Sequence, residues 1–379
     1  MEQNYENAIA TLNTLQSNNS VLQDSIQSRH KNDSKHTSDT VKFLKRIGIT
    51  MEKLDLLPVI HVSGTKGKGT TCAMVESILR LNGYRTGFYS SPHLVSVTER
   101  IRLDGQPISK DRFAEHFWKI YNMLFAAQER DSDMPSYFGF LTLLALNVFI
   151  GSVDVAVIEV GIGGRYDCTN VIRNAQTVGI TSLGLEHTQL LGETLEAIAW
   201  QKAGIVKQGS EVFVAEQPAE CIAVIESECR LKNAKLHIVP SRLEQYRWTK
   251  IPTMAHNRCP EMEINTSLAT QIAVNWIRRT RPHILPFDDK LLIPESIIEG
   301  VNCYFWPGRL QIIPCEGKRT IFLDGTSGFV HNSVKSIFDY IDNNYPARDE
   351  PCDILITGSI HLLGATLIAL RMEDRVLWR

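Results

Sequence analysis

The glycine-rich stretch HVSGTKGKGTTCA runs from His61 to Ala73. The apolar run Val59–Val62 leads into it and predicts a strand, and a helical pattern begins at Lys68. Its glycines let backbone N–H groups turn inward, the helix N-terminus adds positive potential, and the lysine can reach terminal phosphates. The stretch therefore predicts a phosphate loop, although Gly69 separates the lysine from Thr70, which are adjacent in the common pattern. The alternative is a glycine-rich turn with surface lysines.

Apolar, β-branched runs alternate with amphipathic segments around and after this loop. The expected strands are Val59–Val62, Val153–Val160, Thr177–Ser182 and Glu211–Ala215, and the expected helices are Lys68–Asn82 and one around Thr194–Ala203. This alternation predicts βαβ units and a parallel sheet, in which ligands bind at the carboxyl ends of the strands. We therefore expect the chemistry to follow Val62, Val160 and Ser182.

The length of 379 residues exceeds one ordinary core and predicts two α/β domains with a ligand between them. Residues 1–57 are expected to form a short helix followed by a polar mobile loop from Ser17 to Thr40. That helix is indicated by apolar residues at helical spacing, Tyr5, Ala8, Leu12 and Leu15. Residues 58–250 are the expected catalytic domain.

The aperiodic segment Trp248–Pro260 is the expected linker to a smaller α/β domain at residues 261–379. A fresh helical pattern, Ile264–Ile277, opens this second domain. Two strand candidates, Thr320–Leu323 and Asp353–Ile356, follow it. The sequence thus predicts a second domain with helices and a small sheet.

The composition favours small anionic ligands over nucleic acid or membrane. The net charge is −2, so no global basic field attracts DNA or RNA. The most apolar stretch, Tyr137–Ile150, is shorter than the roughly 20 residues that span a bilayer and predicts a buried helix closed by Gly151.

The eight cysteines form no CxxC pair, which favours a reducing compartment. The N-terminus shows neither an apolar signal core nor an Arg-rich presequence, so we expect a cytoplasmic protein, with a mitochondrial form left open.

Four long motifs carry a resemblance to a known family. HVSGTKGKGTTCA, GFYSSPHLVSVTERIRLDGQPIS, VIEVGIGGRYDCTN and EHTQLLGETLEAIAWQKAGI occur in the order found in folylpolyglutamate synthases, especially animal ones. The resemblance is continuous from His61 to Gly209 and includes FWPGR, LDG and the closing ITGSIHLLG. It implies a phosphate-loop parallel-sheet domain of Mur ligase type with a smaller C-terminal α/β domain.

The resemblance also implies roles for matching positions. ATP is assigned to Gly67, Lys68, Gly69, Thr70, Arg309 and Asp324, magnesium to Ser91, Glu159 and His187, and catalysis to Lys68, Lys202 and His187. The lysine at the position of Lys202 becomes carbamylated in this family, which would supply an anionic oxygen ligand for a second metal. A monovalent cation is a further cofactor that the resemblance admits.

The residues themselves support these roles unevenly. Glu159 ends an apolar strand, where a carboxylate needs a cation or hydrogen bonds. Ser91 follows the predicted strand Gly87–Tyr89 and could equally be an N-cap or turn serine. His187 is a poor match for magnesium, which prefers oxygen, and could be structural. Lys202 could simply complement the end of a helix dipole before a glycine cap.

The implied reaction is the ATP-dependent ligation of L-glutamate to the γ-carboxylate of tetrahydrofolate or its polyglutamates through an acyl phosphate. The implied partners are tetrahydrofolate and its polyglutamates, L-glutamate and ATP. We expect a monomer that binds neither nucleic acid nor membrane.

Three departures from the family pattern leave two alternatives open. The family's HQ stretch is replaced by Glu261–Asn265, its DGAH motif reads DGTS from Asp324, and the segment between Tyr345 and Cys352 is too short for the usual strand–helix units. One alternative is a degenerate paralogue that binds nucleotide or folate without ligating. The other is a dihydrofolate synthase.

Overall fold

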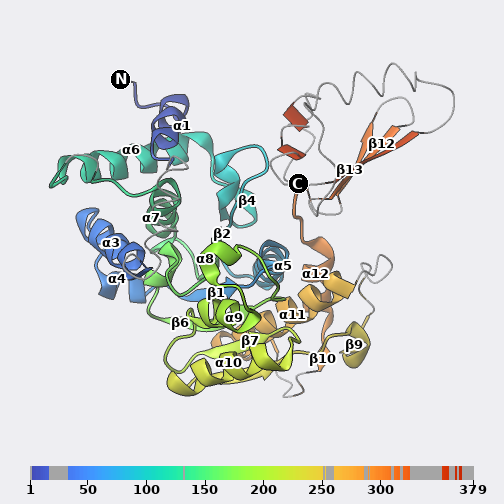
Figure 1. Ribbon diagram of the computed structural model, residues 1–379. Coiled ribbons are helices and arrows are strands. Elements are labelled where there is room, and N and C mark those ends of the chain that lie inside the picture. Colours follow the sequence, from blue (N-terminus) through green and yellow to red (C-terminus); the bar gives the residue numbers. More distant parts are fainter. Residues whose placement is uncertain are drawn as a thin grey trace. The chain divides into compact units, whose positions relative to one another are not determined.

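The computed structural model describes residues 2–16, 33–130, 133–250, 252, 260–285, 289, 291–308, 311–315, 319–324, 352–357, 363–364 and 367–368. Two compact units make up the chain (Figure 1). The first unit comprises Met1–Ser91 and Ile101–Tyr304, and the second comprises Pro92–Arg100 and Phe305–Arg379.

An eight-stranded sheet in the order β4-β3-β2-β5-β1-β6-β7-β8 organises the first unit. Its strands are β1 (Val59–Ser63), β2 (Thr86–Tyr89), β3 (Ile101–Leu103), β4 (Gln106–Pro107), β5 (Val155–Glu159), β6 (Ala175–Ile180), β7 (Glu211–Val214) and β8 (Lys235–Ile238). All pairs from β2 to β8 in this order are parallel, and β3 and β4 add an antiparallel edge. Every residue of β1 and β5 is buried, as in the centre of a covered parallel sheet, so the predicted parallel α/β fold is confirmed.

Helices pack on this sheet and on each other. The bounds are α5 (Lys68–Leu81), α6 (Lys110–Ala126), α7 (Tyr137–Phe149), α8 (Thr188–Leu191), α9 (Leu195–Ala203), α10 (Ala219–Leu231), α11 (Pro260–Thr280) and α12 (Glu295–Cys303). Short 3-10 turns are η1 (Val97–Arg100), η2 (Cys168–Val171) and η3 (Leu243–Gln245). α5 packs between α11, α12 and the strands β2 and β5, and α9 packs on α10. Helix α7 is buried as predicted, and no helix among the described residues has both the length and the apolar character needed to cross a membrane.

The N-terminal region differs in part from the predicted mobile loop. Helix α1 (Tyr5–Thr14) is where the sequence predicts it, but α3 (Asp33–Arg46) occupies the end of the segment expected to be loop. Tertiary contacts stabilise α3, because Lys42 and Arg46 both form ion pairs with Asp133 and Leu44 is fully buried. The remaining part of the predicted loop, residues 17–32, lies outside the described residues, and α4 (Met51–Asp55) follows α3.

The boundary between the units lies later than the predicted linker. Trp248–Pro260 falls within the first unit, which continues to Tyr304. Two short strands flank α11 and pair in parallel, β9 (Arg247–Trp248) with β10 (Leu292–Ile293), so the chain returns to the same unit after the helix. α11 is buried over most of its length and packs on α5, β6 and β7, which is why it belongs to the first unit.

The second unit contains a small sheet in the order β11-β12-β13. The strands are β11 (Gln311–Cys315), β12 (Arg319–Asp324) and β13 (Cys352–Thr357). β12 and β13 are parallel and include both strands that the sequence predicts for this region. The segment between Tyr345 and Cys352 that the family normally extends lies outside the described residues up to the start of β13.

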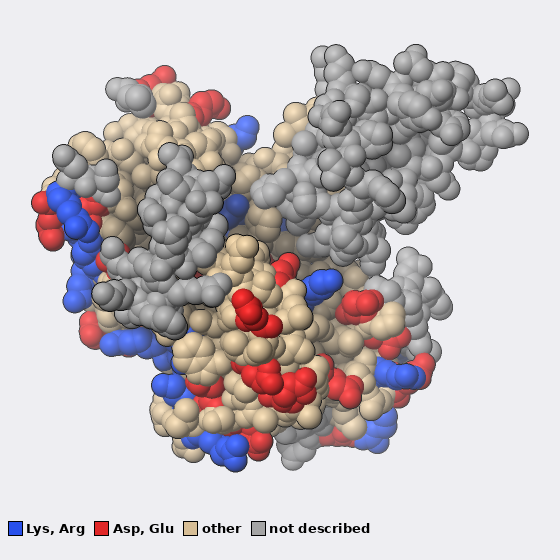
Figure 2. All heavy atoms as spheres, viewed as in Figure 1, with Lys and Arg blue, Asp and Glu red and all other residues tan. Residues whose placement is uncertain are grey.

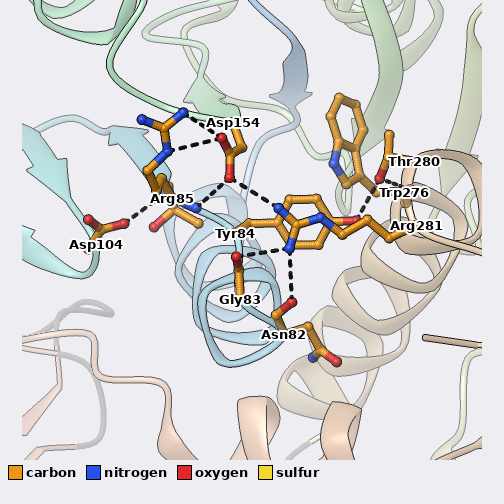
Figure 3. A network of polar contacts seen from close by, with 10 residues as sticks. Asn82, Gly83, Tyr84, Arg85, Asp104, Asp154, Trp276, Thr280 and Arg281 are labelled. Carbon is orange, nitrogen blue, oxygen red and sulfur yellow. Dashed lines mark hydrogen bonds and ion pairs between the residues drawn. The ribbon is translucent and has the colours of Figure 1, made fainter. Parts of the chain in front are cut away.

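Arg281, just beyond α11, anchors the end of that helix (Figure 3). Its Nη1 donates to Gly83 O at 2.9 Å, and its Nη2 lies 3.2 Å from Asp154 Oδ2. The guanidinium also covers the ring of Tyr84, 3.9 Å from the centroid, and Arg85 binds the other carboxylate oxygen of Asp154. β2 begins directly after Arg85 and β5 directly after Asp154. The network therefore fixes the amino ends of these two strands, opposite to the carboxyl ends where the phosphate loop lies.

Candidate active site

The loop after β1 has the strand–loop–helix geometry that the sequence predicts. Gly67 caps α5 in the left-handed conformation with a φ of +86°. Gly64, with a φ of +144°, comes so close to the chain after β6 that a Cβ there would lie 1.8 Å from Thr181 Oγ1. Only glycine fits this backbone, so the loop conformation depends on two glycines of the motif.

Two lysines from distant parts of the sequence meet at the carbonyl of Gly64. Lys68 donates Nζ to Gly64 O at 3.1 Å and to Thr65 O at 3.3 Å, folding back over its own loop. Lys202, in the last turn of α9, donates Nζ to Gly64 O at 2.6 Å. A carbonyl oxygen has two lone pairs and can accept both bonds. Amino groups therefore gather at the carboxyl end of β1, the place where a phosphate group would be held.

Burial changes the acid–base chemistry of Lys202. The residue is only 3% exposed. This burial, together with the positive charge of Lys68, lowers the pKa of Lys202 to about 7. The neutral, nucleophilic amine is thus well populated near neutral pH. The side chain contacts Gly64 rather than the end of its own helix, so these contacts do not favour the alternative of a lysine that only complements a helix dipole.

The ends of β5 and β2 bring Glu159 and Ser91 together. Glu159 is the last residue of β5 and is 4% exposed, and its Oε2 accepts the backbone N–H of Ser91 at 3.0 Å. β5 lies between β2 and β1 in the sheet, and these three strands are parallel. The pair and the phosphate loop therefore both lie at the carboxyl ends of these strands. A buried carboxylate requires compensation, and this N–H supplies part of it.

His187 lies on a different element from that pair. It caps α8 with a left-handed backbone, φ 51° and ψ 37°, and it is exposed. Such a conformation is uncommon for a residue other than glycine. Among the described residues, no group of three or more His, Cys, Asp and Glu side chains could hold a metal. A hydrogen bond joins Ser91 to Glu159, and His187 lies at the N-cap of the short helix α8.

A buried carboxylate holds the glycine-rich segment that follows β5. Asp167 Oδ2 accepts the N–H groups of Gly161 and Ile162 at 3.1 and 3.2 Å. Its Oδ1 accepts the Thr169 hydroxyl at 2.5 Å, and that hydroxyl lies 2.9 Å from Nε2 of His61 in β1. Since the hydroxyl donates to the carboxylate, the imidazole must donate from Nε2. The glycines of this segment are visible in the sequence, but the link from His61 to Asp167 depends on the fold.

Asn265 is a site residue that sequence reasoning missed. It lies in the replaced HQ stretch, is buried near the start of α11, and comes so close to the loop that a Cβ on Gly67 would lie 2.1 Å from its Oδ1. The sequence analysis placed this helix in the second domain, so it predicted no contact between the helix and the phosphate loop. Of the two ATP residues expected in the second unit, Arg309 lies outside the described residues and Asp324 is the last residue of β12.

The surface charge near α9 and α10 is acidic. Figure 2 shows Asp and Glu side chains over these helices on the face that it presents, and Glu196 and Glu220 lie in their first turns. A polyanionic ligand is repelled by such a face.

Named relatives of this chain are folylpolyglutamate synthases. The chain is 42% identical over 339 residues to the mitochondrial enzyme of Bos taurus and 41% identical over 338 residues to that of Homo sapiens. Both alignments cover 85% of this chain and 57% of the relative, so the chain spans little more than half the length of these proteins. It is also 38% identical to the probable folylpolyglutamate synthase of Schizosaccharomyces pombe, over 93% of this chain and 72% of that one. No family model matches the chain.

Solved structures show the same fold. The apo form of L. casei FPGS aligns with a TM-score of 0.76 and 23% identity, over 97% of this chain and 100% of that one. A structure described as an FPGS-AMPPCP-folate complex gives a TM-score of 0.75 at 23% identity, over 97% of this chain and 99% of that one. The expected α/β fold of Mur ligase type is thereby confirmed.

Proposed function

Since the chain belongs to the folylpolyglutamate synthase family, we propose that it uses ATP to ligate L-glutamate to the γ-carboxylate of tetrahydrofolate or its polyglutamates. The observation that carries this proposal is that Lys68 and Lys202 both bind the Gly64 carbonyl. This carbonyl lies at the same carboxyl ends of the parallel strands as the Ser91–Glu159 pair. A glycine loop with two amino groups suits the transfer of a phosphoryl group, because that reaction depends mainly on positioning and charge stabilisation.

In this proposal the phosphates of ATP lie on the loop that opens α5. The backbone N–H groups of Gly67, Gly69 and Thr70 face the phosphates, and Lys68 exchanges its bonds to loop carbonyls for bonds to the terminal phosphate. The family motifs also assign Arg309 and Asp324, which belong to the second unit, to ATP. The support for these two roles is the family motif alone.

A magnesium ion fits the chemistry of Glu159 and Ser91, which offer a buried carboxylate and a hydroxyl oxygen. His187 would be the third ligand that the resemblance implies, and a monovalent cation would be a further occupant. When bound, magnesium neutralises charge on the phosphate oxygens.

The proposed chemistry proceeds in two steps without a nucleophile from the protein. The folate γ-carboxylate attacks the γ-phosphorus of ATP, and the bond to ADP breaks to give an acyl phosphate. The amine of L-glutamate then attacks the acyl carbon, phosphate leaves, an amide forms and a proton is released. Lys68 stabilises negative charge during the first step.

We further propose that the neutral amine of Lys202 reacts with carbon dioxide. The new N–C bond gives a carbamate, and the amine loses a proton. The lowered pKa of Lys202 supports this reaction, because it makes the unprotonated amine available near neutral pH. Intact-mass measurement in bicarbonate with and without chemical trapping of the carbamate would test it.

The decisive experiment is ATP-dependent incorporation of labelled glutamate into tetrahydrofolate by the purified chain. Lys68→Ala is expected to abolish incorporation, because losing a phosphate contact raises the activation barrier of phosphoryl transfer by about 3–4 kcal/mol. The fold should persist in this variant. Lys66→Ala is the matched control, because Lys66 is an exposed lysine of the same loop. Near-normal ligation by a folded Lys68→Ala chain would refute the assignment.

The degenerate-paralogue alternative rests on the short C-terminal region. If it holds, MgATP still binds, because the loop supplies the phosphate contacts, but ligation is weak or phosphate is released without glutamate incorporation. Measuring both products in one reaction separates the alternatives. Full coupling excludes the paralogue, and no ATP binding excludes a functional loop.

Two finer points belong to the same proposal. Dihydropteroate offered as the acceptor tests the dihydrofolate synthase alternative, which requires a product with this substrate. Cell fractionation would distinguish the expected cytoplasmic location from the mitochondrial location named for the bovine and human relatives.

A further inference from the structure

The last turn of α9, which carries Lys202, has a hydrogen-bond donor for each carbonyl at its end. An α-helix leaves its last four carbonyl oxygens without partners inside the helix, and in α9 they belong to Trp200, Gln201, Lys202 and Ala203. The Val206 N–H donates to Ala203 O at 3.0 Å. The hydroxyl of Ser63, the last residue of β1, donates to Lys202 O at 3.0 Å. The other two donors come from a single residue of the segment that follows β5.

Arg165 supplies these two donors. Its backbone N–H donates to Gln201 O at 2.7 Å, and its Nη2 donates to Trp200 O at 3.1 Å. The guanidinium lies 3.8 Å from the centroid of the Trp200 ring, and Nη2 also forms an ion pair with Glu228 of α10 at 2.7 Å. Because the two side chains are only 21% and 9% exposed, solvent screens this ion pair weakly. Arg165 thus ties the end of α9 both to its own segment and to α10.

The segment and the helix end meet at backbone contact distance. A Cβ on Gly164 would lie 2.9 Å from Lys202 O. A Cβ on Gly204 would lie 2.4 Å from Cβ of Arg165. The side-chain amide of Asn170 adds bonds to Arg165 O at 2.8 Å and to Gly204 O at 3.2 Å. Such a close junction leaves the last turn of α9 little freedom to shift while Arg165 stays in place.

Lys202 reaches the phosphate loop from this junction. Its Nζ donates to Gly64 O at 2.6 Å, and its side chain comes from the helical turn that Arg165 holds. Glu159, at the end of β5, lies six residues before Arg165 in the chain. The same short segment therefore starts at the carboxylate proposed for magnesium and ends at the helix that carries the buried lysine.

We propose that Arg165 is a positioning residue, which holds the amine of Lys202 at the phosphate loop by fixing the end of α9. Loss of its guanidinium removes the donor to Trp200 O and the cation beside Glu228, so the last turn of α9 opens more often. The amine then leaves Gly64 O, whereas the phosphate loop keeps its own conformation. The consequence for ligation rests on the proposed function, and it falls on catalysis and not on ATP binding.

The first test is acetylation of the folded full chain by a water-soluble N-hydroxysuccinimide ester, with the modified lysines identified by peptide mass spectrometry. Lys202 is 3% exposed, so this bulky reagent reaches it only when the end of α9 opens. Exposed Lys66 of the same chain is the internal reference. Arg165→Met should raise the rate at Lys202 relative to Lys66 by about tenfold or more, the effect of a lost charge-assisted hydrogen bond on local opening. Glu228→Gln is a milder change and should raise the relative rate by a smaller factor.

Arg281→Met is the matched control. Arg281 also lies at a helix end, with its guanidinium 3.9 Å from the centroid of the Tyr84 ring and with bonds to Gly83 O and Asp154, but at the amino ends of the strands. Its loss should destabilise the chain without changing the relative rate at Lys202. An unchanged rate in folded Arg165→Met, or an equal rise in Arg281→Met, would overturn the proposal. If Arg165→Met does not fold, Glu228→Gln takes its place in this comparison, and an unchanged rate there overturns the proposal equally.

Ligation kinetics supply a second readout. Arg165→Met should lower kcat by about tenfold or more, as losses of positioning contacts do, while KM for ATP stays the same. A raised KM at unchanged kcat would contradict a positioning role. If the unmodified chain does not ligate, the proposed function fails, while the acetylation rates still decide on Arg165.

Discussion

Gly67→Ala tests the geometry of the phosphate loop without any assumption about activity. The backbone at Gly67 has a φ of +86°, and an alanine in a left-handed conformation costs about 1–2 kcal/mol. The new Cβ would lie 2.1 Å from Asn265 Oδ1, so the amide must rotate or α11 must shift. Overpacking of this kind costs about 1–3 kcal/mol. Because the obstructing atom ends a side chain, we expect a total loss of about 2–4 kcal/mol of unfolding free energy.

Two further variants separate the backbone effect from the clash. Gly48 has a φ of +77°, and a Cβ there would meet nothing within 4 Å. Gly48→Ala should therefore cost only the backbone part, about 1–2 kcal/mol. In a double-mutant cycle, Asn265→Ala should relieve the clash in Gly67→Ala, leaving a coupling energy of about 1–3 kcal/mol.

Urea unfolding followed by circular dichroism measures the unfolding free energies of the unmodified chain, the three single variants and the double variant under one set of conditions. Gly67→Ala should be less stable than Gly48→Ala, and adding Asn265→Ala should restore part of the stability that Gly67→Ala loses. Equal losses for the two glycine variants, or additivity of Gly67→Ala with Asn265→Ala, would refute the close contact between α11 and the loop.

The remaining predictions concern a carboxylate, a lysine and an arginine. Glu159→Gln should raise the magnesium concentration needed for ATP binding, measured by titration, and should do so more than His187→Ala; unchanged dependence would remove Glu159 from the metal site. The pKa of Lys202 falls to about 7 from 10.5, so between these values the unfolded chain holds a proton that the native chain lacks, and stability rises with pH. Urea unfolding at pH 7, 8 and 9 should show this rise, and Lys202→Met should flatten it. Arg281→Met should lose about 1–3 kcal/mol with its contacts to Gly83 and Asp154 (Figure 3), measured against the exposed Arg279→Met; similar values for both would show that the network is not stabilising.

Local sequence patterns predicted the central sheet and the phosphate loop. Buried parallel strands have continuous apolar sequences, so the positions of β1, β5, β6 and β7 in the chain could be predicted without knowledge of tertiary contacts. The loop is similarly local, since its glycines, its lysine and the following helix are adjacent in the chain. Helix α3 was missed because its stability comes from ion pairs with Asp133, far along the sequence.

Local patterns in the sequence were thus sufficient to predict the central strands, the phosphate loop and, through the motifs, the family. Only the tertiary structure decided which distant groups meet, including Lys202 at Gly64 O, Asn265 beside Gly67, and the assignment of α11 to the first unit. The physical reason is that helix and strand periodicity arises from neighbours in the chain, whereas burial, pKa and close approach depend on what the folded chain brings near. The lowered pKa of Lys202 is such a property, because it comes from burial and from the charge of Lys68, and neither can be read from the residues around Lys202.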